Sequence, residues 1–266
     1  MNVPEVLAAF RDETRHLAYP GETLEQLPAV TRRRGQVSMF NSVTAYILVA
    51  EAVDFEIQSQ ISYFSELGQE FEWKVFSFDE PPDLKERLAA AGFEVGPKEA
   101  VAIYDLQLAS YDFASMKEWD VVVVKSDQQL EDYRELAELI FGRDHGSTVS
   151  ALKKGIEESD TYHQAFLLYI DGKAVSMGRL YTHPQSCFAG FYGGGTHPDY
   201  CGKGYYRSII AARAMVAQER GVRYLQVDAL PTSLPILNRL GFEHLVDTWP
   251  CTLNTVSHDS VRKISA

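Results

Sequence analysis

A glycine-rich stretch, "GGGTHPDYCGKGYYRSIIAARA" from Gly193 to Ala214, is the part of the sequence whose residue types suggest chemistry. Three consecutive glycines are followed by Gly202 and Gly204, and then by apolar residues at helical spacing. A glycine loop that leads into a helix can hold phosphate, because the helix N-terminus offers N–H groups and the positive end of its dipole. The spacings of the common nucleotide and dinucleotide loops are absent, so this pattern alone leaves the phosphate compound open.

The elements around this loop predict a mixed sheet flanked by helices. From about residue 118 onward the predicted order is β-α-α-β-β-β-α-β-α-β. The first strand is "DVVVVKS", and its Ser126 with Gln129 has the pattern of a capping box. Asp171-Gly172 between two apolar runs predicts a two-residue hairpin. The central strands are therefore expected to be antiparallel, whereas the later ones are joined by helices.

Two segments, residues 73–94 and 222–243, align without gaps at a constant offset. Each predicts a strand, an acidic turn, a proline entering a helix and a glycine ending that helix, where Gly92 matches Gly241. We interpret this as a duplication, because the shared residues are those that begin and end the elements. The alternative is coincidence between two ordinary strand–helix–strand units.

The repeat predicts two related lobes in an α/β (α+β) protein. Residues 1–115 form a degenerate, partial copy, and residues 116–266 form the complete one. In the first lobe, "AVTRRRGQVSMFNSVTAYILV" predicts a strand pair around Arg34-Gly35.

Composition excludes several classes of function. The net charge of −12 opposes binding to a nucleic-acid backbone. No apolar run reaches the roughly 18 residues of a membrane span, and the N-terminus lacks a signal-peptide pattern. Three cysteines without CxxC spacing predict a cytoplasmic protein without disulfides or a thiolate metal site. The histidines likewise show no metal-ligand spacing.

The element order, with the glycine loop between the fourth strand and the third helix, resembles the GNAT acyltransferase superfamily. Its pyrophosphate motif, which begins with Arg or Gln and ends with two spaced small residues, falls on Cys201 to Tyr206. The preceding Pro198-Asp199-Tyr200 and the later "PILNRLGF" also match. The resemblance covers the second lobe, about residues 118–256, and extends weakly to the first. The chain thus resembles a tandem GNAT protein with a degenerate N-terminal copy.

This resemblance implies an N-acyltransferase that moves acetyl from acetyl-CoA to an amine by direct attack in a ternary complex, without a metal. The expected cofactor-binding residues are Gly194, Gly195 and Thr196 for pantetheine, Gly202, Lys203, Gly204, Tyr205, Tyr206 and Arg207 for pyrophosphate, and Ser233 beside the cofactor. Without a ligand, Gly194 to Thr196 would form only a strand-ending bulge, and Gly202 with Gly204 would form only a tight turn. Ser233 would then be simply a helix cap. The acceptor is expected to be a small molecule or peptide, and the first lobe to shape its site or to form a homodimer surface.

Four positions depart from the family pattern. Cys201 replaces the Arg or Gln of the motif, and Tyr206 replaces a small residue. Leu230 and Leu237 stand where the family often has an asparagine and a tyrosine general acid. These departures motivate an alternative function, a coenzyme A-binding sensor or interaction protein with weak or lost catalysis.

A general base is needed to remove a proton from the attacking amine. Asp228, at the end of the fifth predicted strand, and His197, beside the cofactor strand, are the candidates. The alternatives are a turn or capping role for Asp228 and an exposed loop position for His197. Tyr181 and Tyr192 are expected to belong to the core.

Overall fold

The computed structural model describes residues 1–18, 21–35, 41–108, 112–115, 119–159 and 162–255. Its contacts divide the chain into two compact units. Within the described ranges, the first unit contains Met1–Phe10 and Val101–Leu245, and the second contains Arg11–Gln36, Phe40–Ala100 and Val246–Ala266. The chain therefore passes between the units several times. The predicted lobes 1–115 and 116–266 concern the sequence repeat and stay a prediction.

The sheet of the first unit is mixed and mostly antiparallel, as predicted. Its strands follow the order β6-β11-β10-β9-β8-β7. They are β6 (Glu99–Asp105), β7 (Val121–Val123), β8 (His163–Ile170), β9 (Lys173–Thr182), β10 (Phe188–Thr196) and β11 (Tyr224–Ala229). The pairs β7–β8, β8–β9 and β9–β10 are antiparallel, whereas β10 and β11 are parallel.

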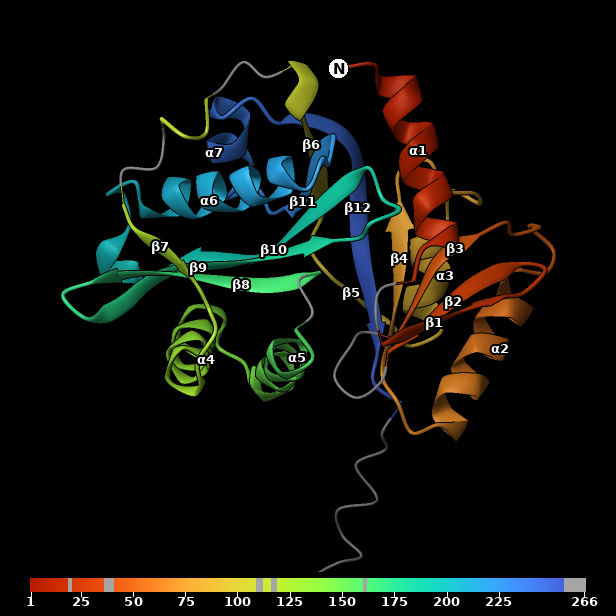
Figure 1. Ribbon diagram of the computed structural model, residues 1–266. Coiled ribbons are helices and arrows are strands. Elements are labelled where there is room, and N and C mark those ends of the chain that lie inside the picture. Colours follow the sequence, from red (N-terminus) through yellow and green to blue (C-terminus); the bar gives the residue numbers. More distant parts are fainter. Residues whose placement is uncertain (19–20, 36–40, 109–111, 116–118, 160–161, 256–266) are drawn as a thin grey trace, which may run out of the picture. The chain divides into compact units, whose positions relative to one another are not determined.

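Helices cover both faces of this sheet (Figure 1). Helices α4 (Asp127–Phe141) and α5 (Gly146–Glu157) lie on one face, where Tyr133 packs with Leu167 and Met177. Helices α6 (Tyr205–Glu219) and α7 (Leu234–Arg239) lie on the other, where Ile209 and Leu237 join the larger core. Apolar residues at helical spacing predicted α4 and α6, and the proline and glycine of the repeat predicted α7.

Short sequence patterns predicted the start of α4 and the hairpin turn between β8 and β9. The Ser126 side chain accepts from the Gln129 amide, and the Gln129 side chain accepts from the Ser126 amide, which is the predicted capping box. Asp171 and Gly172 both have positive φ, as a two-residue hairpin turn between β8 and β9 requires. The structure confirms both predictions.

The second unit contains its own group of strands and its own core. Strands β1 (Glu22–Gln26), β2 (Val30–Gly35), β3 (Ser42–Tyr46), β4 (Phe71–Phe76) and β12 (Glu243–Leu253) follow in that order, and β5 (Glu94–Val95) pairs with β12. Helices α2 (Val53–Glu66) and α3 (Leu84–Ala90) contribute to a core around Trp73. Pairing of β2 with β3 confirms the predicted strand pair, but Arg34 and Gly35, around which the turn was predicted, lie within β2. Residues 36–40 of the connection lie outside the described residues. Helix α1 (Val3–His16) was not predicted.

The two repeated segments end their helices with the same geometry. Gly92 and Gly241 have φ of 100° and 90°. The Phe93 amide donates to the Leu88 carbonyl at 3.0 Å, and the Phe242 amide donates to the Leu237 carbonyl at 3.1 Å. The aligned residues therefore occupy equivalent positions after α3 and α7.

No described helix is both long and apolar enough to cross a membrane. Within the same residues, no group of three or more His, Cys, Asp or Glu side chains is arranged to hold a metal ion. The three cysteines form no disulfide.

Gly178 on β9 makes room for the buried Arg213 of α6. A Cβ at position 178 would lie 2.8 Å from Arg213 Cζ and 2.9 Å from Ile209 Cγ2. We expect Gly178→Ala to lower the free energy of unfolding by about 1–3 kcal/mol through overpacking. Chemical denaturation measures this, with Ser150→Ala on the exposed side of α5 as the control. Equal stability of the two variants would contradict the packing described.

Candidate functional site

The candidate site begins where β10 and β11 diverge. Their parallel pairing runs from Phe188–Tyr224 to Gly190–Gln226 and stops there, although β10 continues to Thr196. On its other edge β10 stays paired with β9, with a register shift between Tyr192 and Gly195. The backbone of β10 beyond Gly190 thus has an edge that β11 does not cover. The predicted pantetheine residues lie in this segment.

Two of these residues also contact the neighbouring strand. Ser176 is fully buried, and its hydroxyl donates to the Gly195 carbonyl at 2.9 Å and lies 2.8 Å from Thr196 Oγ1. A Cβ at Gly195 would lie 3.0 Å from Ile140 of α4. Contact with β9 therefore holds the end of β10 in place while its opposite edge diverges from β11.

The loop after β10 leads directly into α6. Gly202 and Gly204 have φ of 77° and 84°, which favour glycine. Gly204 is the N-cap and no side chain caps the helix. Helix geometry leaves the first amides of α6, those of Tyr205, Tyr206 and Arg207, without intrahelical acceptors. These amides and the helix dipole suit a phosphate group.

Cations gather beside this helix start. Lys203 and Arg207 are exposed, and Lys203 Nζ lies 5.0 Å from the centre of the Tyr200 ring. Lys173 Nζ lies 5.5 Å from the same ring. Cys201, exposed in the loop, stands where the resemblance implied an Arg or Gln side chain. Lys203 and Lys173 lie beside the Tyr200 ring and bring positive charge close to the loop.

The two tyrosines that begin α6 point into the protein. Tyr205 is 6% exposed and its ring packs on Trp119 with centroids 5.0 Å apart. A Cβ at Gly194 would lie 2.9 Å from Cε2 of Tyr206, so the Tyr206 ring lies against Gly194. Tyr206 also hydrogen-bonds to Arg213. Only the backbone amides of these residues are therefore suited to the phosphate.

The two predicted bases have different surroundings. Asp228 lies on β11 two residues beyond its last pair with β10, and its Oδ1 is buried. His197 is 7% exposed, its Nδ1 accepts from the Asp199 amide, and its Nε2 lies 3.1 Å from Lys173 Nζ. The turn thus occupies Nδ1 of His197 and Lys173 of β9 contacts Nε2, which does not favour a catalytic role. The structure leaves both assignments untested.

The remaining predicted positions belong to α7. Ser233 is its N-cap, and the hydroxyl donates to the Leu230 carbonyl at 3.1 Å. Leu237 is fully buried in the core, whereas Leu230 is 41% exposed. The side chain of Leu237 therefore packs in the core and cannot donate a proton.

Sequence analysis missed a polar cluster on the face of the sheet that α4 and α5 cover. We call it the arginine cluster, and it consists of Tyr133, His145, His163 and Arg179. Gly193 in the divergent part of β10 adjoins it, because a Cβ there would lie 3.1 Å from Arg179 Nε and 3.4 Å from Tyr133 Oη. These residues come from four separate segments, and only the fold brings them together.

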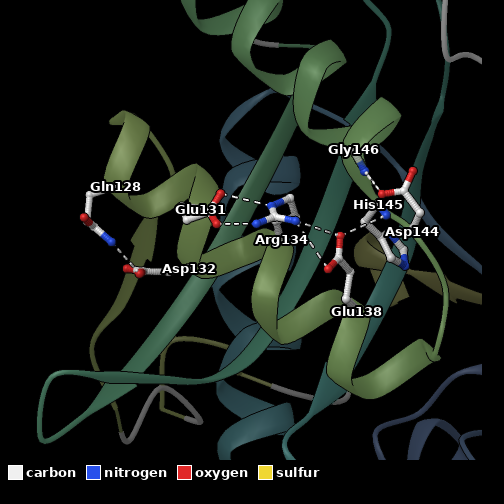
Figure 2. A network of polar contacts seen from close by, with 8 residues as sticks. All are labelled: Gln128, Glu131, Asp132, Arg134, Glu138, Asp144, His145 and Gly146. Atoms are coloured by element: carbon white, nitrogen blue, oxygen red, sulfur yellow. Dashed lines mark hydrogen bonds and ion pairs between the residues drawn. The ribbon is translucent and has the colours of Figure 1, made fainter.

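In the connection between α4 and α5, side-chain carboxylates accept hydrogen bonds from backbone amides (Figure 2). Glu138 accepts from the His145 amide at 3.5 Å, and Asp144 accepts from the Gly146 amide at 3.1 Å. Arg134 forms ion pairs with Glu131 and Glu138 on α4. This network fixes the turn from which the buried imidazole of His145 extends.

Burial and positive charge keep the histidines of the cluster neutral. Burial, with a smaller contribution from Arg179, lowers the pKa of His163 to about 3. Burial followed by Arg143 and Arg179 lowers the pKa of His145. The His163 ring stacks on Tyr181 with centroids 3.9 Å apart.

Comparisons with known proteins agree on the fold. No family model and no curated protein matches the sequence. A GCN5-related N-acetyltransferase from Kribbella flavida superposes with a TM-score of 0.64 at 12% identity, covering 94% of this chain and 95% of that one. A tandem GNAT protein from the clavulanic acid biosynthesis pathway gives 0.54 at 13% identity over 96% of both chains. A GCN5-related N-acetyltransferase from Sphaerobacter thermophilus gives a TM-score of 0.59 at 13% identity, covering 95% of this chain and 85% of that one.

These likenesses show the GNAT fold that the glycine loop and the element order predicted. The tandem arrangement fits, since the likeness to a tandem GNAT protein spans nearly the whole chain. The degenerate nature of the first copy stays a prediction.

His163 should make stability depend on pH. The unfolded chain has an ordinary histidine pKa near 6.5, so it binds a proton before the folded protein does as pH falls. The free energy of unfolding should therefore decrease below about pH 6.5, with at most ~1.4 kcal/mol per pH unit from this residue.

Urea denaturation at about pH 7 and about pH 5 tests this, and His163→Gln should reduce the decrease. His244→Gln, at an exposed position, is the control. An undiminished decrease in H163Q would show that His163 does not supply the linked proton.

Proposed function

We propose that this protein is an N-acyltransferase that transfers acetyl from acetyl-CoA to an amine acceptor. The observation that carries the proposal is the combination of a divergent β10–β11 pair and an uncapped N-terminus of α6 at the end of β10. An extended thioester substrate needs a strand edge for its amide arm and an anion site for its phosphates. The divergent pair and the loop offer these two features next to each other.

The loop residues have defined roles in this proposal. Gly202 and Gly204 let the backbone approach the pyrophosphate closely, and Lys203 with Arg207 adds positive charge. The amides of Tyr205 and Tyr206 bind phosphate oxygens, while Gly194, Gly195 and Thr196 pair with the pantetheine amides. Ser233 borders the substrate at the start of α7. Cell compartment and the role of the second unit stay predictions.

Chemistry proceeds by direct attack of the amine nitrogen on the thioester carbonyl carbon. A C–N bond forms, the amine loses a proton to a base, and the C–S bond breaks to release the thiolate. Asp228 is the proposed base because it lies on β11 just beyond the point of divergence. No proton donor stands at Leu237, so water protonates the thiolate, whose pKa of about 8.5 permits it to leave unprotonated.

The alternative function is a coenzyme A-binding sensor without efficient catalysis. Burial of Leu237 in the core favours it, because the position of a general acid is filled by an apolar side chain. General acid–base catalysis contributes about 10²–10⁴-fold, so its absence slows the reaction without preventing binding. Turnover distinguishes the two functions.

Binding of acetyl-CoA tests the loop. We expect Gly204→Val to abolish binding, because the side chain strains the positive φ and fills the space beside the helix start. The double variant Lys203→Met with Arg207→Met keeps the backbone, and it should bind about 10-fold more weakly, with a reduced dependence on salt.

Isothermal titration calorimetry measures both effects, and circular dichroism checks the fold. Lys154→Met on the exposed side of α5 is the matched control for loss of positive charge. Unchanged affinity in a folded Gly204→Val variant would refute the assignment of the loop.

Release of thiol from acetyl-CoA in the presence of an amine panel tests catalysis. Asp228→Asn should lower kcat by about 10²–10⁴-fold and leave acetyl-CoA affinity unchanged, because it removes the base without touching the loop. Glu219→Gln at the exposed end of α6 is the control. A Cys201→Ser background prevents the exposed thiol from reacting with the reagent. Binding without turnover on any acceptor would favour the sensor.

A further inference from the structure

Arg179 on β9 lies beside the divergent part of β10 with an unused hydrogen-bonding capacity. It pairs with Tyr192 across the two strands, next to Gly193. Its Nε is buried without a hydrogen-bond partner, and among the described residues its side chain forms no ion pair. A Cβ at Gly193 would lie 3.1 Å from Nε and 3.4 Å from Nη2, so the guanidinium borders the β10 backbone. A charged group with a buried polar atom that forms no hydrogen bond lowers the stability of the folded protein, unless a ligand pairs with it.

Other polar atoms around Arg179 also lack partners. Tyr133 is fully buried and its Oη has no hydrogen bond, and it would lie 3.4 Å from the same Cβ at Gly193. His145 is 5% exposed, and its Nε2 is unpartnered, as is the buried Nε2 of His163. The side chains of Tyr133 on α4 and His145 in the α4–α5 turn are both more than nine-tenths buried. Each thus has a polar atom that forms no hydrogen bond within the described residues.

Nearby acidic groups are engaged elsewhere. Glu138 forms an ion pair with Arg134 and accepts from the His145 amide, and Asp132 accepts from Tyr169. Burial is the main cause of the lowered pKa values of His145 and His163, and Arg179 lowers both further, while Glu138 and Asp144 act in the opposite direction on His145. The arginine cluster therefore presents donors and a positive field, which suit an anion.

We propose that Arg179 and Tyr133 bind a carboxylate group of one of the two substrates. Guanidinium groups bind planar carboxylates through two parallel hydrogen bonds, and the Tyr133 hydroxyl is a further donor. The proposal rests on the proposed function, because only then does a substrate lie at the divergent strands. The carboxylate belongs either to an amino-acid-like acceptor or to a dicarboxylic acyl group on the thioester.

Matched ligand pairs test the proposal by calorimetry, independently of turnover. For acceptors, glycine, phenylalanine and lysine are compared with methylamine, phenylethylamine and cadaverine, with coenzyme A present. For donors, succinyl-CoA is compared with butyryl-CoA. We expect one carboxylate ligand to bind at least ~10-fold more tightly than its neutral partner. The expected loss of this preference in Arg179→Met is about 10- to 100-fold.

Companion variants separate binding from structure. Arg179→Lys should retain part of the preference, Tyr133→Phe should lose a smaller part, and exposed Arg143→Met is the matched control. Thermal unfolding should show Arg179→Met to be at least as stable as the wild type, because a half-buried charge whose buried Nε has no hydrogen-bond partner is removed. A destabilised Arg179→Met variant would indicate a structural arginine and overturn the proposal.

The outcomes distinguish this proposal from the function on which it rests. No carboxylate preference in any pair, or a preference that persists in Arg179→Met, overturns the carboxylate site and leaves acetyl transfer intact. A carboxylate preference without acyl transfer to any amine supports the site and refutes the enzyme. Preference within the succinyl-CoA pair places the carboxylate on the acyl group, and preference within an amino-acid pair places it on the acceptor.

Discussion

The end of hydrogen bonding between β10 and β11 after Gly190 is the constraint on which the rest of the first unit depends. A strand that loses its neighbour must be held from its other edge, and β9 does this through the Ser176 hydroxyl and the pairs at Gly195 and Thr196. The same divergence exposes a backbone edge, directs the chain into the loop before α6, and brings Gly193 next to the arginine cluster. The proposed binding edge of β10 and the adjoining arginine cluster thus have one geometric origin.

Two arginines near the central strand β9 differ in how fully their guanidinium groups are hydrogen-bonded. Arg213 is 1% exposed, donates to the carbonyls of Ile209 and Arg179, and lies over the Phe191 ring. Burial lowers its pKa to about 10, so it stays charged at neutral pH. Among the described residues, Arg179 Nε has no hydrogen-bond partner, although the residue is only half-buried. Backbone carbonyls accept the hydrogen bonds of Arg213, which is therefore a structural residue. By contrast, Arg179 is the residue that we propose to bind a ligand.

Sequence periodicity and turn chemistry predicted most of the elements of the first unit, because each depends on neighbouring residues. Ser126 with Gln129, Asp171 with Gly172, and the glycine that ends α7 are examples. The arginine cluster was not predictable, since Tyr133, His163 and Arg179 are distant in sequence and none has a local pattern. The assignment of β12 from Val246 to the second unit depends on long-range strand pairing and also escaped prediction.

The contact between Gly194 and Tyr206 couples the residues that these two positions can hold. With the Tyr206 ring where it is, a Cβ at position 194 would come within 2.9 Å of it. A larger residue at position 194 therefore requires the Tyr206 ring to move, and a smaller residue at position 206 would relieve the contact. Substitutions at these two positions should thus be non-additive in their effect on stability.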